Sequence, residues 1–167
     1  MTRLFLLALS FLLASCAGYQ LGGQKPKHLE GITKLAVPTF ENQTLEPRLA
    51  STVTNALIKQ IQMDGSYQIV NKDQAEAVLE GDVTRVDRSQ FRSSRRNVLR
   101  TAQLQMRLTC NFNIIDTASG RPIHHGQASA NSYVILDSNV QNSEAQALED
   151  AAQRLSASIA NEISEGW

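Results

Sequence analysis

The alternation of apolar and polar residues predicts three long β segments in the second half of the chain. It is clearest in the middle one, Leu99 to Ile115. Val78 to Phe91 precedes it, and the turn Asp116 to Gly120 leads into Ile123 to Ile135. A two-residue period places apolar side chains on one sheet face and polar ones on the other. The apolar row is Leu104, Met106, Leu108, Cys110, Phe112 and Ile114, and the polar row is Gln103, Gln105, Arg107, Thr109, Asn111 and Asn113.

Two shorter apolar runs, Lys34 to Phe40 and Tyr67 to Val70, predict two further strands. Pro38 places the first at a sheet edge or a strand end, because proline cannot donate to a hydrogen-bond ladder. We expect Glu41 to Thr44 to be a loop.

Two segments carry the period of amphipathic helices. The first starts at Pro47, which suits a first helical turn, and Gly65 should end it with a left-handed cap. In the second, Ser143 and Gln146 fit a capping box, and Gly166 ends the helix. The first apolar stripe is Leu49, Val53, Leu57 and Ile61. The second is Ala145, Leu148, Ala152, Leu155, Ile159 and Ile163.

These elements predict an α+β fold, a two-layer sandwich in which two amphipathic helices pack on a mostly antiparallel sheet of four to five strands. Both helices should cover the one apolar face of the sheet. Residues 32–167 are enough for a single domain with its own core.

The first 15 residues have the pattern of a secretory leader. Arg3 is followed by an apolar run and then by Ala14 and Ser15, directly before Cys16. The run is shorter than the ~20 residues that a spanning helix needs. Small residues ending in Cys resemble a lipobox, in which Cys16 receives a diacylglycerol and an N-acyl chain. We therefore expect residues 1–15 to be a signal peptide and residues 16–31 to be a lipidated tether; a plain signal peptide is the alternative.

The predicted anchor also predicts a compartment. The mature chain would face the periplasm, and Ala17, where an Asp would favour the inner membrane, favours the outer membrane. Removing the leader with Arg3 leaves 15 Lys and Arg against 16 Asp and Glu, so net charge predicts no partner.

The distribution of charge is more informative, because no acidic residue lies between Asp87 and Asp116. Residues 93–97 should connect two strands of a long hairpin, with the arginines projecting from its end and along the polar face. Arginine binds phosphate or carboxylate in a bidentate manner. The alternative is a solvated hairpin whose charges prevent sheet-to-sheet pairing. Nucleic acid is not expected in this compartment. The candidate anion-binding residues are Arg88, Arg92, Arg95, Arg96 and Arg100.

Other reactive residues have structural interpretations. Cys110 would be a lone thiol on an apolar strand face, so we expect it to be buried. His124 and His125 are neighbours on a strand and should point to opposite faces, which does not predict a metal site. The chain has no nucleophile elbow and no Gly-rich phosphate loop, so we expect no enzyme.

Residues 18–21, Gly-Tyr-Gln-Leu directly after Cys16, resemble the start of LptE-family lipoproteins. The sequences of residues 35–44 and 75–81, before the first helix and the long strands, agree with this. The resemblance implies two helices on a small sheet, no catalysis and a position inside the LptD β-barrel. It also implies assistance in barrel assembly and binding of lipopolysaccharide. The family offers no motif for the binding residues, so the arginine candidates rest on local charge alone.

The same strand and helix modules also resemble a second class of periplasmic lipoproteins. These oligomerise into secretion pores or activate peptidoglycan synthases. Self-assembly into rings, or binding to a synthase, would favour that alternative.

Overall fold

The computed structural model describes residues 25–92, 103–135 and 140–166. Its elements follow one another as strand, strand, helix, strand, a short 3₁₀ helix, three long strands and a final helix. They are β1 (Lys34–Ala36), β2 (Glu41–Asn42), α2 (Leu49–Asp64), β3 (Gln68–Ile69), η2 (Lys72–Gln74), β4 (Ala77–Arg92), β5 (Gln103–Asp116), β6 (Pro122–Ile135) and α3 (Val140–Glu165).

One six-stranded sheet contains all the described strands, in the order β3-β1-β4-β5-β6 with β2 also on β4. The three long strands are antiparallel, whereas the short strands pair in parallel. The predicted α+β class is confirmed, but the predicted count of four to five strands is too low. The run from Lys34 ends at Ala36, before Pro38, and Glu41–Asn42, predicted as a loop, pairs with β4 as a separate strand.

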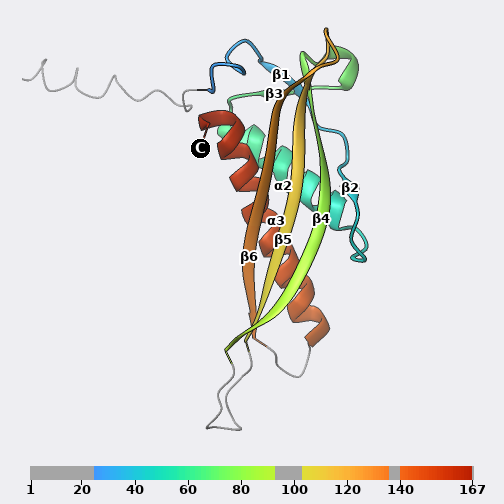
Figure 1. Cartoon of the computed structure of the whole chain (residues 1–167), viewed down its shortest axis with the longest axis vertical. Helices are drawn as coiled ribbons and strands as arrows, with labels where there is room; N and C mark the ends of the chain where they lie inside the picture. Colours follow the sequence, from blue (N-terminus) through green and yellow to red (C-terminus); the bar gives the residue numbers. More distant parts are fainter. Residues whose placement is uncertain (1–24, 93–102, 136–139, 167) are drawn as a thin grey trace, which may run out of the picture.

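Both helices lie against the same face of this sheet, as expected (Figure 1). The predicted apolar row of β5 is buried from Met106 to Ile114, with exposed fractions of at most 1%. The buried Ser156 hydroxyl on α3 donates to the Val53 carbonyl oxygen on α2 at 3.1 Å. The helices therefore pack against each other as well as against the sheet.

A β-bulge at Thr84 changes which residues of β4 face the helices. Val83 pairs with Cys110, whereas Arg85 pairs with Thr109, so Thr84 has no partner residue on β5. The extra residue shifts the alternation by one position. Beyond the bulge, Arg88 lies on the helix side of the sheet.

The helix ends follow the glycine predictions. Gly65 and Gly166 take φ values of 76° and 79° and donate to Ile61 and Glu162 carbonyl oxygens, both at 3.0 Å. The predicted capping box is wrong, because α3 already includes the three residues before Ser143.

Cys110 is buried, as predicted, and burial raises the pKa of its thiol to about 12. In a Cys16→Ser chain, Cys110 is the only thiol. We expect it to resist a thiol reagent at pH 8, because a pKa of about 12 makes the thiolate about 1,000-fold scarcer than a thiol with the ordinary pKa of 9.0 would allow. Reagent consumption followed with and without urea measures this. Rapid labelling of the native chain would show that β5 is open to solvent.

Glu76 joins the start of β1 to the start of β4. Its Oε2 accepts hydrogen bonds from the main-chain N–H groups of Thr33 and Lys34, at 2.6 and 3.0 Å. These bonds, with that from the Thr33 hydroxyl, lower the pKa of the Glu76 carboxyl.

Because the pKa of Glu76 is lower in the folded state than in the unfolded state, its contribution to stability decreases as pH falls. The contribution of Glu76 to stability should be complete above its unfolded-state pKa, about 4.3, and be lost as pH falls through the folded-state value. We expect Glu76→Gln to reduce the acid sensitivity of the urea midpoint between about pH 5 and pH 3. Glu41→Gln is the matched control, because no described group donates to the exposed Glu41 carboxylate. If the urea midpoints of the two variants change equally with pH, the hydrogen bonds of Glu76 are not the source of the acid sensitivity.

Candidate functional site

The candidate site is the sheet face opposite the helices, which we call the polar sheet face. Three polar pairs cross from β5 to β6 on it. Arg107 Nε donates to Asn131 Oδ1 at 2.9 Å, Gln127 Nε2 donates to Asn111 Oδ1 at 2.8 Å, and Asn113 Oδ1 lies 2.6 Å from His125 Nδ1. The face includes Glu80, Asp82, Arg85, Asp87, Ser89, Gln103, Gln105, Arg107, Thr109, Asn111, Asn113, His125, Gln127, Ser129, Asn131 and Tyr133.

These cross-strand bonds hold the side chains of the polar sheet face in fixed positions. Amides and hydroxyls offer donors and acceptors in alternation, and the charged groups carry both signs. Arg85 Nε lies 3.8 Å from Asp87 Oδ2, for example. Such a face suits a wet, polar surface better than an apolar one.

The sequence predicted the β5 half of this face but not the β6 half. The inward residues of β6 are small, among them Gly126, Ala128 and Ala130, so its apolar alternation is weak. The polar residues between them were the available signal. Pairing with β5 is what assigns them to the same face.

Arg88 is the one predicted anion-binding residue whose side chain is described. It was expected along the polar face, and that placement is wrong because of the Thr84 bulge. Its guanidinium pairs with Glu46, before α2, and its Nε lies 3.9 Å from Glu144 Oε2 on α3. Arg88 thus joins β4 to both helical segments.

The other candidates lie at or beyond the end of the described strands. Arg92 is the last residue of β4, and its main chain pairs with Gln103 at the start of β5. Arg95, Arg96 and Arg100 fall in residues 93–102, outside the described residues, as does Cys16. Arg92 and Gln103 thus mark one end of the paired strands β4 and β5.

The two neighbouring histidines point to opposite faces, as predicted. His125 lies on the polar sheet face. His124 lies on the helix side, where its Nε2 is 3.2 Å from Glu162 Oε1 and its Nδ1 is 3.1 Å from His28 Nε2. Within the described parts of the chain, no group of three or more His, Cys, Asp or Glu could hold a metal ion.

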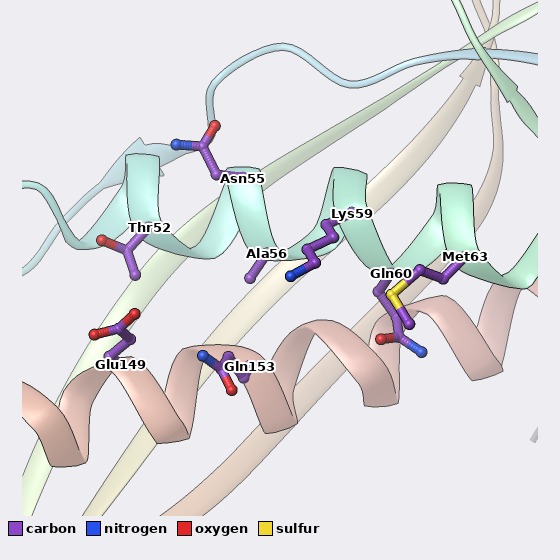
Figure 2. A pocket seen from close by; sticks show the side chains of 8 residues that line it. All are labelled: Thr52, Asn55, Ala56, Lys59, Gln60, Met63, Glu149 and Gln153. Atoms are coloured by element: carbon purple, nitrogen blue, oxygen red, sulfur yellow. The ribbon is translucent and has the colours of Figure 1, made fainter.

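A groove of about 520 Å³ runs between α2 and α3 (Figure 2). Thr52 and Glu149 point toward one another across it, whereas Asn55 points away. Met63, 72% exposed, lies at one end. The full lining is Thr52, Asn55, Ala56, Lys59, Gln60, Met63, Glu149 and Gln153. The groove contains none of the predicted site residues.

None of the helices in the described segments has the length and apolar character that crossing a membrane requires.

Solved structures with this fold come from several bacteria. The PelC dodecamer from Paraburkholderia phytofirmans is 14% identical, with a TM-score of 0.56 over 85% of this chain and 94% of that one. A minor lipoprotein from Acinetobacter baumannii is 15% identical, with a TM-score of 0.54 over 79% of this chain and 92% of that one. The protein XCC0632 from Xanthomonas campestris is 10% identical, with a TM-score of 0.57 over 84% of this chain and 88% of that one. At such identities the likeness shows a common fold.

Comparison with curated proteins finds no match. The family model LptE, described as lipopolysaccharide-assembly, matches residues 32–163, which are most of the 167 residues. The matched range contains all the described strands and nearly all of both helices. The chain belongs to the LptE family of lipopolysaccharide-assembly proteins.

Proposed function

We propose that this protein is an outer-membrane lipoprotein that plugs an LptD-type β-barrel, helps assemble it and assists lipopolysaccharide transport to the outer leaflet. Membership of the family supports the pathway. The observation that carries the plug role is the polar sheet face, built from three strands of 14 to 16 residues. The interior of a large barrel is polar and wet, so a hydrogen-bonding face of this length can line it without burying unpaired groups.

The proposed anchor is Cys16, carrying a diacylglycerol and an N-acyl chain, and no other cofactor is required. Two or three acyl chains hold a protein on a membrane far more firmly than one. Residues 17–31 would link this anchor, on the periplasmic side of the outer membrane, to the domain. The role is one of binding and assembly rather than catalysis, and it involves no nucleic acid.

Lipopolysaccharide would be bound through the arginines at the hairpin end, since guanidinium groups pair with phosphates. The proposed residues are Arg88, Arg92, Arg95, Arg96 and Arg100. Arg88 already has Glu46 and Glu144 as partners, so a phosphate would have to displace carboxylates from it. We therefore expect Arg95 and Arg96 to contribute more than Arg88.

Purification of the tagged, lipidated protein from outer membranes in mild detergent tests the proposal. Mass identification should find a stoichiometric barrel of the lipopolysaccharide-export type. Recovery of the lipoprotein alone, free of any barrel, would overturn the plug role.

The second candidate function is that of a periplasmic lipoprotein that oligomerises in a secretion pore or activates a peptidoglycan synthase. One protein of this fold is described as a dodecamer, which favours keeping this candidate. Native mass spectrometry of the detergent extract distinguishes the two. Rings of this chain alone, or a bound synthase, would replace the barrel proposal.

A further inference from the structure

Strand β6 forms one border of the sheet (Figure 1). It is 14 residues long and pairs only with β5 among the described strands. An edge strand of this length presents a row of unpaired main-chain N–H and C=O groups to its surroundings.

The hydrogen bonds at the hairpin identify the residues whose main chain faces this open edge. Thr117 N–H donates to the Glu76 carbonyl oxygen beside β4, whereas Asp116 N–H donates to the Arg121 carbonyl oxygen on the β6 side. Because direction alternates along a strand, the even-numbered residues of β5 bond to β6. Their opposite residues on β6 are also even-numbered from His124 onward. The odd-numbered residues His125, Gln127, Ser129 and Asn131 therefore direct their main-chain N–H groups away from β5.

This edge has little of the usual protection against pairing. Native edge strands commonly carry charged residues, proline or bulges. Beyond Pro122 and the irregularity beside it, β6 continues to Ile135 without a Lys, Arg, Asp or Glu. The interior strand β4 instead carries Glu80, Asp82, Arg85, Asp87, Arg88 and Arg92. The charged residues thus lie on β4, whereas the edge strand β6 lacks the charges that would prevent it from pairing with another strand.

The open edge is also rigidly supported. The buried Ser132 hydroxyl donates to the Ala147 carbonyl oxygen on α3 at 2.6 Å. Ala128 and Ala130 are buried on the same side, while Gln127 and Ser129 are exposed on the other. A strand held in this way binds an added strand with little loss of its own conformational entropy.

We propose that the open edge of β6 binds an extended segment of the barrel partner by β-strand addition; this rests on the proposed function. The strands of a closed barrel wall are paired on both sides, so they cannot supply that segment. The occupant is therefore a stretch of the partner outside the wall's ladder that extends into the lumen. It is uncharged where it meets β6, because the strand offers no opposite charge to pair with one.

Amide hydrogen exchange of the mature lipidated chain, alone and in its complex with the LptD-type barrel, tests this directly. Alone, the amides of His125, Gln127, Ser129 and Asn131 should exchange fast, while the alternate amides bonded to β5 are protected. In the complex, the four fast amides should slow by at least about 100-fold. Protection of these amides in the chain alone at raised concentration would instead assign the edge to a second copy and overturn the proposal.

A proline substitution gives an independent test. Ser129→Pro removes one outward N–H and leaves the bonds to β5, a position that edge strands tolerate. Ser129→Ala removes the same hydroxyl but keeps the N–H, so it is the matched control. We expect about tenfold less barrel recovered with Ser129→Pro than with Ser129→Ala, at equal thermal stability.

The two experiments distinguish a failure of strand addition from a failure of the plug role. If the complex forms but the four amides still exchange fast and the two variants recover equal barrel, strand addition is wrong and the plug role stands. If no barrel is recovered with the unaltered chain, the proposed function itself fails, and the edge proposal fails with it.

Discussion

Replacing Phe112 with Ala is expected to lower the free energy of unfolding by about 3–5 kcal/mol. Phe112 is fully buried in the middle of β5. Its direct neighbours on β4 and β6 are Gly81 and Gly126, which carry no side chains. The Phe112 ring covers Gly126 and the Phe40 ring covers Gly81, so removing the Phe112 ring leaves a cavity in a packed part of the core. A loss of this size is a large part of the stability of a domain, and urea unfolding followed by circular dichroism measures it.

The glycines provide the matching variants. A Cβ on Gly126 would lie 2.3 Å from Phe112 Cζ, whereas one on Gly31 would meet nothing within 4 Å. Gly126→Ala should therefore cost about 1–3 kcal/mol, and Gly31→Ala close to nothing. In the double variant, Phe112→Ala should relieve part of the Gly126→Ala cost. Simple additivity, or a Phe112→Ala cost below about 1 kcal/mol, would show that this row does not anchor the core.

Replacing Cys16 with Ser is expected to abolish lipid attachment and membrane retention. Diacylglycerol is attached to such a cysteine through a thioether, and the serine variant lacks the Cys16 sulfur that forms it. Loss of the acyl chains removes the proposed membrane anchor. Incorporation of labelled palmitate and recovery in the membrane fraction should both fall to background. The barrel complex should fall with them.

The second cysteine supplies the control for this experiment. Cys110→Ala alters a buried thiol and leaves Cys16 in place, so palmitate incorporation should be unchanged. Label absent from the unaltered chain would favour a plain signal peptide over a lipoprotein signal, whereas label retained in Cys16→Ser would assign lipid attachment to another residue.

The parts of the fold that were predictable depend on residues close together in the sequence. The alternation from Leu104 to Ile114 shows the inward face of β5, and Gly65 shows the end of α2. Strand β2 was missed because two residues, Glu41–Asn42, form a strand only through their pairing with β4. That pairing joins residues about forty positions apart, which local patterns do not report.

The position of Arg88 shows how one local irregularity changes a site. Strict alternation from Val83 would place Val86 on the polar face, and Val86 instead lies opposite the buried Leu108. The spacing of these two valines, three residues apart, was the available sign of a bulge. The arginines beyond β4 remain candidates on charge alone, because no motif assigns them to a ligand.

Site-specific photo-crosslinking in living cells would detect a barrel wall that lies against the polar sheet face. A photoreactive residue at Thr109 lies in the middle of this face, on the strand between β4 and β6. We expect an ultraviolet-dependent adduct with the LptD-type barrel. Adducts only with other copies of this chain, or none from protein present in the outer membrane, would contradict it.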